Sequence, residues 1–160
     1  MSRAEDYVAR VDAVERRLEE HAGREVPGGA LTPADPSTGE RWQSGQVWAH
    51  IAEFVPYWLA EMERVVAGHS EPVPFGRTKS DPERIAAIER DRDTDRAALW
   101  HRVVDADSRL RAALAALDER DWQVRGLHPT LGEMDLSRLV EEFLVGHLEQ
   151  HADQLDALAP

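Results

Sequence analysis

Apolar residues recur at steps of three and four along most of this chain, which is the spacing of one face of an α-helix. Four helices are expected, over Ala4 to His21, Ser44 to Val66, Asp81 to Asp118 and Leu136 to Leu158. The alternating pattern and turn signals of a sheet are missing from the sequence, so no sheet is expected. The pattern therefore predicts an all-α fold, a four-helix bundle.

Three long connections separate the expected helices: Gly23 to Arg41, Gly68 to Ser80 and Asp121 to Asp135. Ser44 is the expected N-cap of the second helix, and Asp81 followed by Pro82 is a strong start signal for the third. Connections of this length allow consecutive helices to be non-neighbours in the bundle. A substrate is expected to enter between these three connections.

The composition of the chain excludes several kinds of functional site. The 160 residues fit one domain, 1–160, and the chain has no cysteine, which excludes disulfides, a thiolate nucleophile and any thiolate-bound metal. A metal must therefore be held by histidine and carboxylate. The net charge of −12 disfavours nucleic acid as a partner. Without a signal-like N-terminus or an apolar run of about 18 residues, a cytoplasmic protein with no membrane segment is expected.

Three histidines occupy apolar stripes, where a core helix normally carries leucine. His147 and His151 are four residues apart on the last helix, and His50 holds the same kind of position on the second. One such histidine alone is more often a satisfied core residue. With a stripe covering about three of seven positions, three unrelated histidines would all fall on stripes only about 8% of the time. The joint pattern favours a three-histidine metal site with an open, catalytic-type position.

Competing metal motifs do not fit the sequence. The segment from His147 to His151 has leucine where a zincin helix carries its general-base glutamate. A di-iron bundle needs Glu-x-x-His on two helices, and no histidine here has an acidic residue three positions before it. The four other histidines are interpreted as structural, because they end a helix, lie in loops or flank a stripe: His21, His69, His128 and His101.

Arg92 and Asp95 are polar residues on the stripe of the third helix. They form either a solvated turn or internal ion pair, or part of the pocket. Arg92 is the candidate for binding a cosubstrate, since arginine pairs bidentately with carboxylates. Asp95 is the weaker pocket candidate.

Two segments resemble the DinB-like superfamily in order and spacing: RWQSGQVWAHIAEFVPYW and GLHPTLGEMDLSRLVEEFLVGHLEQHADQLDAL. This group includes the YfiT-like proteins and the metal-binding domain of mycothiol-dependent maleylpyruvate isomerase. The resemblance implies a DinB/YfiT-like four-helix bundle in which His50, His147 and His151 are the metal ligands. It also implies a homodimer and a low-molecular-weight thiol, such as mycothiol or bacillithiol, as cosubstrate.

The leading hypothesis is a thiol-dependent transferase or isomerase acting on a small molecule. Zinc is the favoured ion, with nickel and iron as alternatives. Two other functions stay open: a non-catalytic ligand-binding or stress-response bundle, and a metal-dependent hydrolase. No glutamate stands at a motif spacing that would separate hydrolysis from thiol chemistry.

Overall fold

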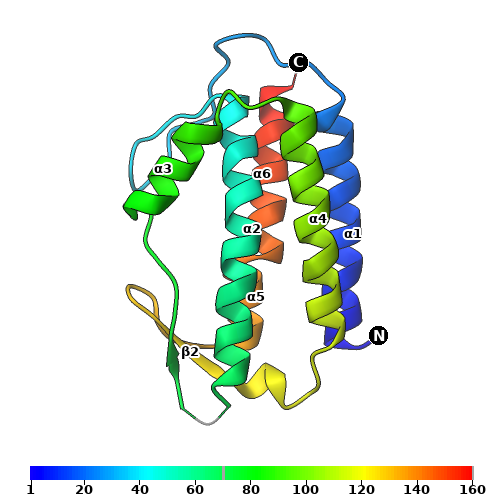
Figure 1. Ribbon diagram of the computed structural model, residues 1–160, viewed down its shortest axis with the longest axis vertical. Coiled ribbons are helices and arrows are strands. Elements are labelled where there is room, and N and C mark those ends of the chain that lie inside the picture. Colours follow the sequence, from blue (N-terminus) through cyan, green and yellow to red (C-terminus); the bar gives the residue numbers. More distant parts are fainter. Residues whose placement is uncertain (70, 160) are drawn as a thin grey trace.

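The computed structural model describes residues 1–69 and 71–159 and contains a bundle of four long helical segments (Figure 1). These segments are α1 (Arg3–Ala22), α2 (Ser44–Ala67), α4 (Arg96–Ala115), and α5 (Leu136–Phe143) continued by α6 (Val145–Leu158). Both α1 and α2 pack against α4 and α6. The four-helix bundle expected from the sequence is confirmed.

The long connections determine which helices are neighbours: α2 packs against α4, although α3 (Pro82–Asp91) and its flanking loops lie between them in the chain. The connection from α1 to α2 crosses one end of the bundle, and α2 and α4 run in the same direction (Figure 1). This parallel arrangement arises because the chain returns along the outside of the bundle before α4 begins. The return segment contains α3, which packs against α2.

The core is centred on α2, whose buried residues face more than one neighbouring helix. Val47, Ile51 and Phe54 have no solvent exposure, and α2 remains one helix through Pro56. Its N-cap is Gln43, one residue before the expected Ser44. Within the described ranges, no helix combines the length and the apolar composition needed to cross a bilayer.

The expected single helix from Asp81 to Asp118 is wrong, because the structure divides it into α3 and α4. The carboxylate of Asp95 accepts a hydrogen bond from the Ala98 amide at 3.3 Å and starts a new helix. Ile88, before the break, and Leu99, after it, are both buried. Their separation equals about three helical turns, so the apolar periodicity continues across it. The last helix is likewise interrupted at Leu144, which has φ −119° and ψ −84°.

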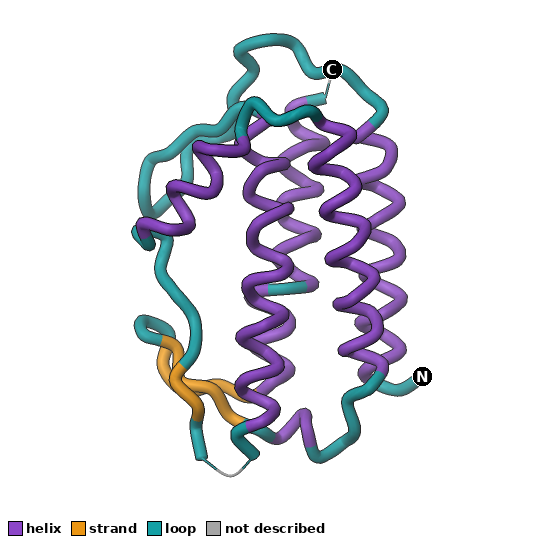
Figure 2. Tube along the Cα trace, in the orientation of Figure 1, coloured by secondary structure: helices purple, strands orange, loops and turns teal. Residues whose placement is uncertain are grey.

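The expectation of no sheet is also wrong. Three short strands form a small sheet in the order β1 (Val73–Pro74), β2 (Arg125–His128), β3 (Gly132–Asp135) (Figure 2). Strands β1 and β2 are parallel, and β2 and β3 form an antiparallel hairpin preceded by a short 3₁₀ helix at Asp121–Gln123. Strands of two to four residues are too short to show an alternating pattern. The sheet lies beside α2 on the same side of the bundle as α3 (Figure 2).

Candidate metal centre

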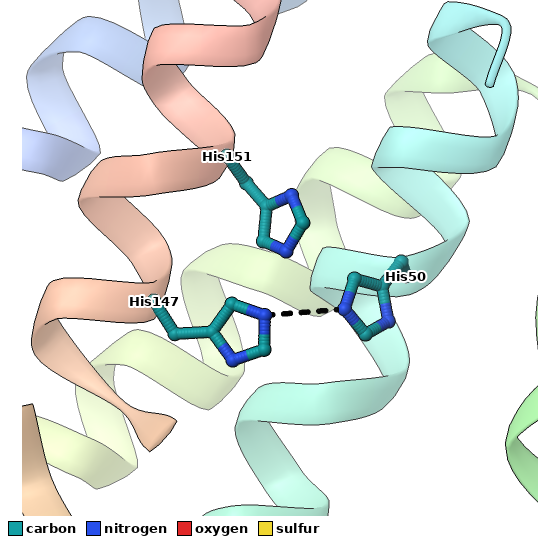
Figure 3. Close-up of side chains that lie close together, drawn as sticks. All are labelled: His50, His147 and His151. Atoms are coloured by element: carbon teal, nitrogen blue, oxygen red, sulfur yellow. Dashed lines mark hydrogen bonds between the residues drawn. The ribbon is translucent and has the colours of Figure 1, made fainter. Parts of the chain in front are cut away.

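The structure brings together the three histidines singled out in the sequence. His50 on α2 faces His147 and His151, which lie one turn apart on α6 (Figure 3). One ring nitrogen from each residue lies within 4.8 Å of the other two. The Nε2 atoms of His50 and His147 are 3.3 Å apart. Two nitrogens bound to one tetrahedral zinc ion at about 2.0–2.1 Å would be separated by about 3.3 Å, so this spacing fits a shared ion.

Neighbouring side chains set the tautomers of two of the rings. The Nδ1–H of His50 donates to the Glu53 carboxylate at 2.8 Å, and that of His151 donates to the Gln154 amide oxygen at 2.6 Å. Because Nδ1 carries the proton in each neutral ring, the Nε2 lone pair remains available. Nε2 of His151 is sealed from solvent and has no hydrogen-bond partner within residues 1–69 and 71–159. An unsatisfied buried acceptor directed at two other imidazoles fits a metal ligand.

Packing fixes the third ring. His147 stacks on Phe54 with ring centroids 4.2 Å apart and an interplanar angle of 12°. Trp42 stacks on His151 at 6.3 Å and meets His50 edge-on at 5.1 Å. Phe54 and Trp42 therefore restrict the orientations of the imidazoles.

Burial keeps the three imidazoles neutral. It lowers the pKa of His50 and of His147 well below the usual value, and the neighbouring histidines lower both further. Burial also lowers the pKa of His151 to about 4, although its bond to Gln154 opposes this shift. Neutral imidazole is the form that binds metal, so the centre is ready to bind an ion at neutral pH.

The carboxylate that accepts the hydrogen bond of His50 also belongs to a buried ion pair. Arg77 donates to both oxygens of Glu53, at 2.8 and 2.5 Å, and its guanidinium carbon lies 3.9 Å from the centroid of the Tyr57 ring. The side chains of Arg77 and Glu53 are only 9% and 7% exposed. Burial raises the pKa of Glu53, and the bond from Arg77 opposes that rise. The pair connects the segment before α3 to the metal centre.

The sequence analysis missed Glu53 and Gln154, although a signal was present. Each stands three residues after its histidine, on the same helix face. In a di-iron motif the acidic residue stands three positions before the histidine, whereas Glu53 stands three positions after His50. His-x-x-Glu and His-x-x-Gln, read in the forward direction, would have identified both partners.

A cavity of about 770 Å³ opens beside the three histidines. Its wall includes residues from all three long connections, which is where substrate entry was expected: Thr32, Lys79, His128 and Leu131 are examples. Trp58 and Phe143 give one side an apolar surface, and Arg84 lies among the remaining lining residues. Lys79 pairs with Asp35 at 2.7 Å and thereby joins two of the connections.

His128 has a structural part in this cavity. The sequence had suggested a position in a loop, but the residue is buried at the end of β2. Its Nδ1 accepts hydrogen bonds from the amides of Thr130 and Leu131, both at 3.2 Å, so Nε2 carries the proton and donates to the Arg77 carbonyl. The ring shapes the cavity wall and lies outside the cluster of three histidines.

The structure does not bring Arg92 or Asp95 into this cavity. Arg92 follows the end of α3 and donates to Glu89 and Gln43, and it lines a separate cavity of about 510 Å³ at the end of the bundle. Asp95 caps α4. Both residues lie at the break between the two helices, so the stripe on which they were placed does not exist there.

Comparison with known proteins agrees with this fold. The family model for the DinB superfamily matches residues 5–155. YfiT from Bacillus subtilis, described as a probable metal-dependent hydrolase with an unusual four-helix bundle topology, gives a TM-score of 0.76 at 17% identity, covering 99% of this chain and 87% of its own. No curated protein matches the chain at significant sequence similarity.

The mycothiol-dependent maleylpyruvate isomerase is also similar in structure, with a TM-score of 0.68 at 18% identity. A variant of that isomerase gives 0.69 at 16% identity. Each comparison covers 99% of this chain, but the chain spans only 62% of the isomerase. At these identities the likenesses establish the fold alone.

Proposed function

This chain belongs to the DinB superfamily, and we propose that it is a metal-dependent transferase or isomerase that uses a low-molecular-weight thiol. The observation that carries the proposal is the convergence of three neutral imidazoles, two buried and one half-buried, beside a large cavity. Three protein ligands leave a further coordination position for a small molecule, as in catalytic rather than structural sites. Zinc is the favoured ion, with nickel and iron as alternatives.

A divalent ion held by these histidines would supply Lewis acidity and lower the pKa of a thiol reaching its open position. The protein's own groups have other tasks. Glu53 and Gln154 hold His50 and His151 in the ligating tautomer. Phe54 stacks on His147 and restricts its orientation.

The thiol must come from a cosubstrate, because the chain has no cysteine. Ligand cavities commonly measure about 300–1,000 Å³, so the cavity of 770 Å³ is large enough for a thiol cosubstrate. One similar solved structure is described as mycothiol-dependent. Mycothiol and bacillithiol are therefore the thiols to test.

A metal-dependent hydrolase is the second candidate, and it is favoured by the likeness to YfiT from Bacillus subtilis. Hydrolysis requires a group that accepts a proton from water. Glu53 contacts a histidine, but its carboxylate is already held by His50 and Arg77. A divalent ion would lower the pKa of bound water as well as that of a bound thiol, so the preference for thiol chemistry rests on the likeness to a mycothiol-dependent isomerase.

Calorimetric titration of zinc-loaded and metal-free protein with mycothiol and bacillithiol tests the proposal. We expect at least one thiol to bind the zinc-loaded form about tenfold more tightly or better, because only that form offers the open position. S-methylated thiols, which cannot ionise, are the matched control and should lose the difference. Equal affinity for both protein forms, or none for either, contradicts the thiol-dependent function.

A further inference from the structure

Arg84 is the cationic residue of the cavity that lacks an acidic partner. It lies in the first turn of α3 and is only 7% exposed. Arg77 is paired with Glu53 and Lys79 with Asp35, whereas no carboxylate within residues 1–69 and 71–159 forms an ion pair with Arg84. An arginine that is mostly buried and has no acidic partner is unusual, so its position at a cavity wall points to an anionic ligand.

One edge of the guanidinium is available. Nη1 donates to the Lys79 carbonyl at 2.8 Å, while Nε and Nη2 of Arg84 have no acceptor in the part of the chain that the structure describes. Neither atom is among the polar atoms sealed from solvent. The Nε and Nη2 groups form the fork that binds both oxygens of a carboxylate.

Arg84 is also close to the metal centre. Its guanidinium carbon lies 5.6 Å from the centroid of the Trp42 ring, and the same ring contacts His50 and His151. The guanidinium and two of the imidazoles are therefore packed around the same indole ring.

The charges around the cavity also favour an anionic ligand once a metal ion is bound. Of the described residues, the charged ones that line the cavity are three cations and three carboxylates: Arg77, Lys79 and Arg84, and Asp35, Glu40 and Glu142. The cavity is therefore close to neutral before an ion binds. A divalent ion on three neutral ligands would add two positive charges. A ligand that bridges Arg84 and the ion is therefore favoured if it is anionic.

We propose that Arg84 binds a carboxylate of the small molecule whose other end reaches the metal centre. This inference rests on the proposed function for the metal end of the molecule. It defines the substrate or cosubstrate as an anionic compound, with its carboxylate held by Arg84 next to Trp42. It also assigns to Arg84 the role that the sequence had suggested for Arg92.

Matched probes test this assignment on the zinc-loaded protein. Mercaptoalkanoates of increasing length, such as 3-mercaptopropionate and 6-mercaptohexanoate, are compared by calorimetry with the mercaptoalkanols of the same length. The members of each pair differ only in the carboxylate. For the length that fits best, we expect the carboxylate probe to bind about tenfold more tightly or better, which corresponds to about 1.4 kcal/mol.

Arg84→Gln should remove this preference while leaving the zinc content unchanged. Arg92→Gln is the matched control and should keep it, because Arg92 lies outside the cavity. Arg84→Lys keeps the charge without the fork and should retain only part of the preference, which provides a second test if Arg84→Gln folds poorly. A wild-type protein without the preference at any length, or a preference that survives in Arg84→Gln or remains complete in Arg84→Lys, would overturn the assignment.

A cobalt-substituted sample separates this inference from the proposed function. Thiol coordination should change the visible absorption of the cobalt ion. An unchanged spectrum together with an Arg84-dependent carboxylate preference would contradict the thiol function and support the anion site. A changed spectrum without that preference would support the thiol function and overturn the role of Arg84.

Discussion

Replacing Glu53 by glutamine should weaken zinc binding without unfolding the bundle. The Glu53 carboxylate accepts the Nδ1–H of His50 at 2.8 Å, and both residues of its ion pair with Arg77 are almost fully buried. Glutamine can still accept this hydrogen bond, but it removes the negative charge that increases the basicity of the ring. Loss of such an outer partner typically reduces metal affinity about 10–100-fold.

The lower end of that range is expected for Glu53→Gln. The hydrogen bond is retained, and Arg77 already offsets part of the carboxylate charge in the wild type. A tenfold loss corresponds to about 1.4 kcal/mol. Glu53→Leu removes the acceptor as well, so its loss of affinity should be greater.

The assay is competition for zinc with a chromophoric chelator at neutral pH, with circular dichroism to verify folding. Glu61→Gln is the matched control, because Glu61 is also on α2 and accepts from the Gly76 amide at 2.6 Å, next to Arg77. It holds the same segment without touching a histidine. A change of less than twofold in folded Glu53→Gln, or an equal loss in Glu61→Gln, would refute the reasoning.

Three further predictions concern stability and assembly. The pKa values of the three histidines are lowered in the folded state, so the unfolded chain binds more protons below about pH 6.5. In urea unfolding of metal-free protein, the free energy of unfolding should therefore fall as the pH is lowered from about 6.5 toward about 4. The expected decrease is about 1.4 kcal/mol per pH unit for each histidine that stays neutral. A variant with all three replaced by glutamine should lose this slope. Burial and the charge of Glu15 raise the pKa of Asp107 to about 8. The folded protein therefore keeps a proton that the unfolded chain loses above about pH 4, so the free energy of unfolding should fall as the pH rises from about 4 to about 8. Asp107→Asn should therefore exceed the wild type in unfolding free energy at pH 7, with the advantage shrinking toward pH 4; an advantage independent of pH would contradict this. The proposed homodimer should give twice 18.0 kDa by light scattering, and a mass near 18.0 kDa at all concentrations would count against it.

The helices could be predicted from the sequence because their buried faces are periodic. The stripe that includes Val47, Ile51 and Phe54 is buried as expected. The interruptions were hidden because an apolar stripe stays in phase across a break of about three turns, as between Ile88 and Leu99. The short strands were hidden because their pairing depends on partners distant in the sequence, such as Val73 and Gly126.

Only part of the candidate site could be predicted from the sequence. His50, His147 and His151 could be selected because imidazoles on apolar stripes are unusual, and the structure places their nitrogens together. Their role as ligands stays a prediction. Arg84 could not be selected, because its burial and its lack of an acidic partner arise from how α3 lies over the cavity. Periodicity carries no information about that placement.

Elemental analysis of protein purified without a polyhistidine tag tests the metal centre most directly. One equivalent of a divalent ion, zinc in the first place, is expected per chain at neutral pH, because three neutral nitrogens converge there. His147→Ala should lose the ion, whereas His101→Ala, an exposed histidine on α4, should retain it. Stoichiometric zinc or nickel retained by folded His147→Ala would contradict the three-histidine centre.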